Sequence, residues 1–546
     1  MTILLPNIIE AHFALWGAQA AGIASPVNPM LEAAYIARIC AETNAGVIVA
    51  FGPAPGSDIW DKAVDAAEQT ASVHTLLQVD PAAALGQRAA ASSHAPSGRM
   101  PRRPGIQVLD FHDALAAAEP GALASGRIFD PEETCAYFHT GGTTGYPKIA
   151  MHTHSNEAFI GWVLEKVDNR PQVVLSGLPL FHVNGALVTG LWAFHCGSQV
   201  VMLTPAGYRT PGLLDAFWSI ARRFEATTFS AVPTILAALM ARPLPEGGLP
   251  LLKHVFCGAA PLPRQVALGF EQATGMRIHE GYGLTEGSCV STVSPPLGER
   301  RLGTVGIRIP YQELRLFAVG PDGRPSGYAQ PGATGVIAIR GPNVFPGYLR
   351  EADNQGIWIE GGWYNTGDLG RFDEDGRLVL CGRAKELIIR GGHNIDPSMI
   401  EDVLQAHPVV AMAAVVGQPD RHAGELPVAY VTAKPGVDVS PESLLEHARA
   451  TLPERAAVPV RIEVLPALPL TAVGKVSKLH LRLLAIDHVL SEALRAAGLE
   501  GVRAKARLSP EQGTVVDLTG PASARTAAIE LAGLYPVTPH WVEAVE

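Results

Sequence analysis

Apolar and polar positions along the chain follow two alternating periods. Small and apolar residues recur at helical spacing over residues 8–24 and again over residues 213–224, which predicts buried helices. Short β-rich runs at residues 46–50, 173–178, 199–203 and 254–257 predict strands between such helices. This alternation predicts an α/β architecture with at least one mostly parallel sheet.

The pattern changes in the second half of the chain. From about residue 304, short strands separated by turns predict a small β subdomain. A second compact segment with both helical and strand periods runs over residues 385–482. Residues 490–546 form a tail of unknown role, since no pattern there indicates a particular structure.

Composition narrows the function classes. The chain has 546 residues, so we expect more than one domain, and its formal net charge of −10 argues against a nucleic-acid surface. Its six cysteines lie far apart without a CxxC pair, which favours a reducing, cytoplasmic location. No apolar stretch is long enough to span a bilayer, although peripheral membrane contact stays open. The oligomeric state, monomer or homodimer, is also open.

One glycine- and threonine-rich loop at residues 139–148, HTGGTTGYPK, carries candidate phosphate chemistry. Glycines let the backbone approach a polyphosphate, threonine hydroxyls add donors and a lysine adds a point charge. A surface turn of the same composition is the alternative. The candidate phosphate ligands of the loop are Thr140, Gly141, Gly142, Thr143, Thr144, Gly145 and Lys148.

This loop resembles the phosphate loop of the acyl-adenylate-forming superfamily, which includes acyl-CoA synthetases, luciferases and peptide-synthetase adenylation domains. It departs from the usual YTSGTTGxPK form at His139 and Gly142. Further segments resemble family motifs in the same order, so the resemblance covers residues 4–482. They are PLFHVNG (179–185), CGAAPLP (257–263), HEGYGLTE (279–286), WYNTGD (363–368), GRAKELIIRGG (382–392) and LPLTAVGK (468–475).

The resemblance implies a nucleotide site with a metal ion. Thr285 would contact phosphate, and Glu286 would bind Mg²⁺ through its carboxylate. The remaining candidates would surround adenine and ribose: Gly258, Ala259, Ala260, Glu280, Gly281, Tyr282, Gly283, Asp368 and Arg383.

The resemblance also implies a catalytic lysine and a moving domain. Lys475 would bridge the acid and the α-phosphate, and His182 would lie at the acid pocket. Lys385 would be the hinge residue, while Gly391 and Gly392 would line the path of CoA. The expected plan is a large N-terminal domain of stacked α/β subdomains plus a small β subdomain at 1–382, a hinge at 383–386, and a smaller mobile α+β domain at 387–489.

The expected activity is an ATP-dependent acid–CoA ligase that forms an acyl-AMP intermediate, with ATP and CoA as co-substrates. A medium- or long-chain fatty acid is the expected substrate, and an aromatic or short branched acid is the alternative. An inactive nucleotide-binding paralogue is a third hypothesis, because the chain opens on MTILLPN, which resembles an interior strand of relatives. On that hypothesis, a shortened N-terminal subdomain would expose a sheet edge and apolar surface.

Overall fold

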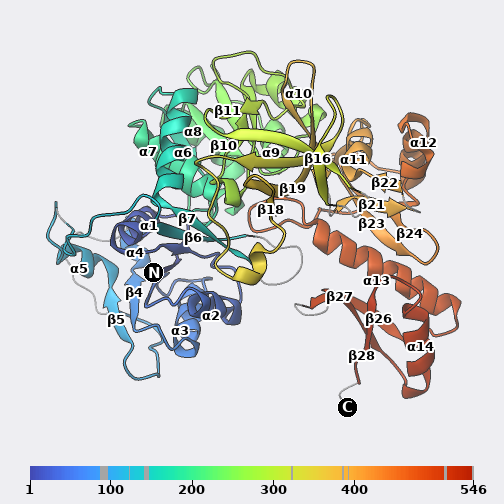
Figure 1. The fold of residues 1–546 in the computed structure, drawn as a ribbon, viewed down its shortest axis with the longest axis horizontal. Helices are drawn as coiled ribbons and strands as arrows, with labels where there is room; N and C mark the ends of the chain where they lie inside the picture. The colour runs from blue at the N-terminus through green and yellow to red at the C-terminus, as the bar shows by residue number, and fades with distance from the viewer. Residues whose placement is uncertain are drawn as a thin grey trace.

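The chain folds into a series of α/β and β units that follow one another in sequence (Figure 1). The structure is a computed structural model that describes residues 1–86, 96–121, 123–140, 147–320, 324–383, 386–390, 393–509 and 513–543. Figure 1 shows the first sheet in blue, the second in green, the β subdomain in yellow and the C-terminal units in orange and red. The predicted fold class, a large mixed α/β N-terminal domain followed by a smaller C-terminal domain, is confirmed.

The first sheet is parallel, with the strand order β2-β1-β3-β4-β5. Alternate residues face opposite sides: Ile48 packs with helices α2 and α3, and Val49 packs with helix α1. The opening strand pairs on both sides, so it is an interior strand of this sheet. The elements are β1 (Thr2–Leu4), α1 (Ile9–Ala21), β2 (Ser25–Pro26), α2 (Ala33–Glu42), β3 (Val47–Phe51), α3 (Ile59–Gln69), β4 (Thr75–Val79), α4 (Pro81–Ala84), β5 (Gln107–Asp110) and α5 (Phe111–Ala116).

The second sheet has seven strands in the order β14-β13-β12-β11-β10-β8-β9. Five of these strands, β8 to β12, run parallel. Helices α8, α9 and α10 bury Phe217, Leu236 and Phe270, respectively, against them. Its elements are β8 (Val173–Ser176), the π-helix η1 (Asn184–Trp192), α7 (Ala193–His195), β9 (Gln199–Met202), α8 (Leu213–Arg223), β10 (Thr228–Ala231), α9 (Pro233–Met240), β11 (His254–Cys257), α10 (Arg264–Thr274), β12 (Arg277–Tyr282), β13 (Thr292–Val293) and β14 (Ile307–Arg308).

Two antiparallel units complete the large domain. A hairpin of β6 (Thr134–His139) and β7 (Ile149–Thr153) leads into α6 (His154–Val167), and its connecting loop is the predicted phosphate loop. The predicted β subdomain is a six-stranded sheet with its own core around Ile337 and Ile339. Its strands are β15 (Glu313–Val319), β16 (Pro325–Tyr328), β17 (Gly335–Arg340), β18 (Trp358–Ile359), β19 (Trp363–Phe372) and β20 (Leu378–Arg383).

The C-terminal part contains two sheets joined by one long helix. The N-terminal half of α13 (Lys478–Ala496) packs on the first of these sheets, and its C-terminal half packs on the second through Leu490 and Leu494. The tail that carried no recognisable pattern is therefore folded around its own core. The elements are β21 (Ile388–Arg390), β22 (His393–Ile395), α11 (Pro397–Gln405), β23 (Val410–Asp420), β24 (Gly424–Ala433), α12 (Pro441–Thr451), β25 (Arg461–Val464), β26 (Arg503–Ser509), β27 (Gly513–Thr519), α14 (Arg525–Ala532) and β28 (Thr538–Trp541).

Candidate active site

Three of the predicted motifs meet at one edge of the second sheet. Strands β8, β10, β11 and β12 are adjacent and parallel, so the loops that follow them leave from the same edge. Open α/β sheets bind ligands at the carboxyl ends of their strands. These loops carry His182 after β8, Gly258 after β11 and Glu286 after β12. Segments as far apart in the sequence as His182 and Glu286 thus form one site.

The backbone of these loops is unusually tight. A Cβ atom on Gly283 would lie 1.6 Å from the carbonyl oxygen of Cys289, so only glycine fits there. Three residues with side chains adopt positive φ in the same loops: Ala259 at 70°, Ser288 at 51° and Cys289 at 87°. Such conformations cost of order 1–3 kcal/mol each and persist where the surrounding structure imposes them, often at functional sites.

Tyr282, Asp368 and Arg383 form one hydrogen-bonded group at the predicted adenine and ribose site. The Tyr282 hydroxyl donates to Asp368 Oδ2 at 2.7 Å, and Arg383 Nε lies 2.8 Å from Asp368 Oδ1. Burial raises the pKa of Asp368, while Arg383 and the Tyr282 hydroxyl act in the opposite direction. Tyr282 and Arg383 thus fix the orientation of the Asp368 carboxyl group, whose remaining lone pairs can accept further donors such as ribose hydroxyls.

The glycines of the two neighbouring strand ends bring the backbones of this site together. A Cβ atom on Gly258 would lie 2.9 Å from the carbonyl oxygen of Gly281, so the loop after β11 lies directly against β12. Ala259 and Ala260 continue that loop with small side chains. The absence of a side chain at Gly258 thus lets the two backbones pack directly against each other.

Glu280 differs from the other predicted adenine and ribose residues. It is buried on β12, and its carboxyl accepts a hydrogen bond from the backbone N–H of Gly303 at 3.1 Å. Burial raises the pKa of Glu280 to about 7, partly offset by the Gly303 N–H and by Arg300. The observed partners of its side chain thus lie on the loop before β14.

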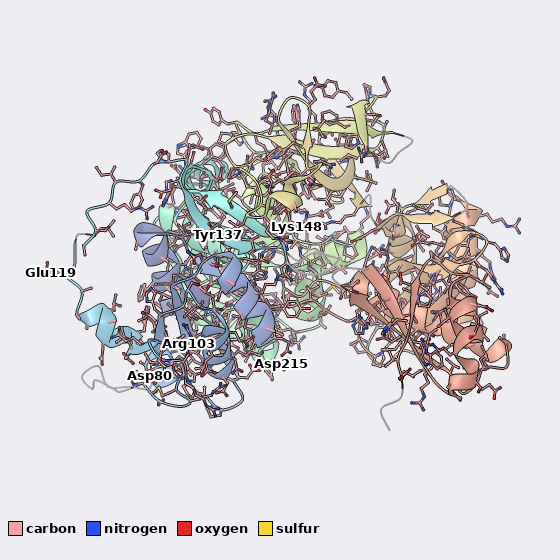
Figure 2. All side chains as sticks on the ribbon, turned by 60° about the horizontal axis from the view of Figure 1, so that its bottom comes forward. Asp80, Arg103, Glu119, Tyr137, Lys148 and Asp215 are labelled. Carbon is pink, nitrogen blue, oxygen red and sulfur yellow. The ribbon has the colours of Figure 1, made fainter. Side chains whose placement is uncertain are left out.

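Glu286 lies on a short 3-10 turn, Thr285–Gly287, beside two tyrosines. The Tyr348 hydroxyl donates to the Glu286 carboxylate and lies 3.1 Å from the Tyr364 hydroxyl. Lys148 Nζ lies 4.6 Å from the centre of the Tyr348 ring and donates to the carbonyl of Asp353 at 3.3 Å. Tyr348 thus links the predicted phosphate lysine with the predicted metal ligand. Figure 2 shows Lys148 near the middle of the molecule, whereas Asp80 and Glu119 lie at its periphery.

The donor set at Glu286 fits a magnesium ion held mainly by a nucleotide. Within the described ranges, no three His, Cys, Asp or Glu side chains form a metal-binding group. Mg²⁺ usually keeps several waters and binds through one or two carboxylates plus substrate phosphates. A single carboxylate beside the phosphate-loop lysine matches that chemistry.

Several predicted residues fall outside the described ranges. They are Gly141, Gly142, Thr143, Thr144 and Gly145 of the phosphate loop, the hinge residue Lys385, and Gly391 and Gly392 of the CoA path. The two ends of the phosphate loop are described: the Thr140 N–H donates to the Lys148 carbonyl at 2.8 Å and closes the hairpin.

Two half-buried histidines of the site are held neutral. Burial, helped by the charge of Lys475, lowers the pKa of His182 to about 3, and burial lowers the pKa of His139 to about 4. The Asn184 N–H donates to His182 Nδ1 at 3.3 Å, so Nε2 carries the proton. His139 accepts the Asn28 N–H at Nε2 at 3.0 Å and stacks on Phe181. His182 thus presents a neutral N–H donor.

Lys475 reaches this site from the C-terminal part of the chain. Its loop is held by a hydrogen bond at 3.0 Å from Thr234 Oγ1, at the start of α9, to the carbonyl of Gly474. Burial, followed by repulsion from Arg383, lowers the pKa of Lys475 to about 8, whereas Asp368 and Glu286 act in the opposite direction. The lysine therefore lies within electrostatic range of the ribose and metal candidates.

Comparison with known proteins identifies the family. The AMP-binding enzyme family matches residues 1–349, more than half of the chain, and the AMP-binding enzyme C-terminal domain matches residues 399–475. The chain belongs to the AMP-binding enzyme family. This confirms the superfamily expected from the motifs.

Individual relatives agree with this assignment. A marinolic acid–CoA ligase of Pseudoalteromonas sp. (strain SANK 73390) is 38% identical over 503 residues, which cover 91% of this chain and 74% of the relative. A long-chain-fatty-acid–CoA ligase of Bacillus subtilis (strain 168) is 32% identical over 360 residues, 64% of this chain and 62% of the relative. The crystal structure of ATP-bound MatB from Rhodopseudomonas palustris superposes with a TM-score of 0.75 at 25% identity, covering 88% and 87% of the two chains. The predicted enzyme class, an acid–thiol ligase, is confirmed.

Some features of the site were not predicted. Tyr348 lies 62 residues from its partner Glu286 in the sequence and belongs to none of the predicted motifs. Thr234, which contacts the loop of Lys475, also belongs to none of the predicted motifs. Among the helices of the described ranges, none combines the length and hydropathy needed to cross a membrane.

Proposed function

We propose that this ligase activates a medium- or long-chain fatty acid with ATP and transfers the acyl group to CoA. The observation that carries the proposal is the uncharged wall beside His182. Residues 184–192 and 228–237, in η1, β10 and the start of α9, contain no charged side chain. The Ser230 hydroxyl in this wall already donates to Asn184 Oδ1 at 3.2 Å. An alkyl chain entering behind its carboxylate would thus meet mainly apolar groups.

In the first step, a carboxylate oxygen of the acid attacks the α-phosphorus of ATP and the bond to pyrophosphate breaks. Both reactants are anions, so the chain's task is alignment and charge neutralisation. Protonated Lys475 faces the acid and the α-phosphate, and the neutral His182 donates its Nε2–H toward the carboxylate. Glu286 is the carboxylate that would hold Mg²⁺, whose chemistry is to neutralise phosphate charge.

In the second step, the thiol of CoA attacks the acyl carbonyl, AMP leaves, and a thioester forms. Lys475 has no task in this step, so we propose that the domain at 387–489 rotates about the hinge at 383–386 and withdraws it. The bond between Thr234 and Gly474 would break in that motion. Lys385 would absorb the rotation, and Gly391 with Gly392 would then border the path of the pantetheine arm.

A panel of acids tests the substrate. Pyrophosphate release is measured with saturated acids of graded chain length and with benzoate-type and short branched acids. We expect kcat/KM to rise with chain length, up to about fourfold for each buried methylene. A preference for aromatic or short branched acids would instead support the alternative substrate class, and release with none of the acids would contradict the proposed activity.

A further inference from the structure

Three polar side chains from separate elements meet beneath the turn that carries Glu286. They are His152 on β7, Glu157 on α6 and Gln19 on α1. Their exposed fractions are 0%, 3% and 8%. Burial of such groups is costly unless each is hydrogen-bonded, and a satisfied network of this kind fixes the geometry of the groups it contacts.

The three side chains form one chain of hydrogen bonds that ends on the turn. Gln19 Nε2 donates to Glu157 Oε2 at 2.8 Å, and Glu157 Oε1 lies 3.2 Å from His152 Nδ1. His152 Nε2 lies 2.8 Å from the carbonyl oxygen of Thr285. A carbonyl only accepts, so His152 Nε2 must carry a proton. The remaining contact needs one more proton, carried by either His152 Nδ1 or Glu157.

The turn is held at both of its ends. The bond from His152 orients the peptide plane shared by the Thr285 carbonyl and the Glu286 N–H. On the other side, Asn343 Nδ2 donates to the carbonyl of Gly287 at 2.9 Å. Glu286 lies between these two peptide planes, and its own carbonyl accepts the Phe345 N–H at 2.9 Å. The direction of its side chain therefore depends on both supports.

We propose that His152 is a positioning residue for the metal-binding turn, held in place by Glu157 and Gln19. It orients the Glu286 carboxylate toward the nucleotide-bound metal without contacting substrate itself. This inference rests on the proposed function, because it takes Glu286 as the metal ligand. None of the three residues belongs to the motifs that identified the family.

ATP binding measured by calorimetry, in Mg²⁺ and in EDTA, tests the proposal without requiring an acid substrate. His152→Leu removes the donor to Thr285. We expect ATP affinity in Mg²⁺ to fall about five- to tenfold, with less than a twofold change in EDTA. His152→Gln retains an N–H at the corresponding position and should stay within about threefold of the wild type. The Mg²⁺ concentration for half-maximal pyrophosphate release should rise in parallel.

His12→Leu is the matched control. His12 is also a buried imidazole, on the same helix as Gln19, but neither of its ring nitrogens has a hydrogen-bond partner among the described residues. This variant should leave the Mg²⁺ dependence unchanged. If His152→Leu does not fold, Gln19→Met decides, with a shift in the same direction of about two- to threefold.

Two results would overturn the positioning role. The first is a loss of ATP affinity in His152→Leu that is equally large in Mg²⁺ and in EDTA, as a purely structural role would give. If Gln19→Met is used in its place, the same criterion applies. The other is ATP binding by the wild type that does not respond to Mg²⁺. A wild type that binds ATP in a Mg²⁺-dependent way but activates no acid would contradict the proposed function and leave the positioning role standing.

Discussion

The two sides of the active site are held in very different ways. On the N-terminal side, the buried Tyr282 and Asp368 are bonded to each other and to the half-exposed Arg383, and Tyr348 and Tyr364 support Glu286. On the C-terminal side, Lys475 lies on a loop that is tied to α9 by the bond between Thr234 and Gly474. In the proposed mechanism, a densely bonded wall suits the nucleotide, which would stay bound through both steps. A lightly tied loop suits the proposed role of Lys475, which would be needed in only one of them.

Lys475→Ala should produce the largest difference between the two half-reactions. Loss of one preorganised charge typically costs about 10²–10³ in rate, so pyrophosphate release should fall by that factor. Thioester formation from supplied acyl-AMP should persist, and single-turnover assays of the two steps separate the effects. Lys166→Ala, on the exposed end of α6, serves as the control. Equal loss of both steps would contradict a role confined to adenylation.

Tyr282→Phe should weaken the opposite wall. It removes the donor to the buried Asp368, and a hydrogen bond to a charged group contributes about 1.5–3 kcal/mol. Urea unfolding should show that loss, and both partial reactions should slow by similar factors because both use the nucleotide wall. Tyr311→Phe, at a tyrosine that is 68% exposed, should be neutral. Selective loss of adenylation alone would argue against this division.

The pH dependence should separate the two steps as well. The pKa of Lys475 is lowered to about 8, so the lysine is protonated below that pH and loses its charge above it. The kcat/KM for pyrophosphate release should therefore fall above about pH 8, approaching tenfold per unit. The rate of thioester formation should not show this fall, the alkaline limb of the pH profile. Lys475→Arg should remove the limb below pH 10 at reduced activity, since arginine stays charged, and its persistence would assign the limb to another group.

Thr234→Val should produce the smallest effect. The substitution keeps the shape but removes the hydroxyl that donates to Gly474, a bond of about 0.5–1.5 kcal/mol. Adenylation should slow by about two- to tenfold while thioester formation is unchanged or faster. Thr234→Ser retains the hydroxyl and should behave like the wild type. A matching loss in both steps would mean that the bond does not favour one domain arrangement.

The sequence was sufficient for the fold class and for the grouping of motifs, because strand periodicity and motif order are local signals. Parallel strands then bring loops such as those of His182 and Gly258 to one edge without further information. Contacts that depend on long-range packing were not predictable. Tyr348 meets Glu286 because β6, β7 and the β subdomain pack together, and no local pattern marks a tyrosine as a ligand partner.

The fold of the C-terminal tail was also not predictable from the sequence, for a different reason. Its core takes Ile486, Leu490 and Leu494 from α13, which begins at Lys478, so the expected boundary at residue 490 falls inside a helix that belongs to both units. A helix shared between two sheets has one continuous helical pattern of apolar residues. The boundary between the two units therefore cannot be recognised in the sequence.

The shared helix also couples the tail to the proposed movement of the C-terminal domain. Helix α13 begins three residues after Lys475 and runs for 19 residues, roughly 28 Å, before it ends in the core of the tail. In the proposed rotation, which withdraws the lysine, this helix would carry the tail along with it. A fluorophore attached to the tail and another on the first sheet would therefore report, in single molecules, how often the enzyme changes from one half-reaction to the other.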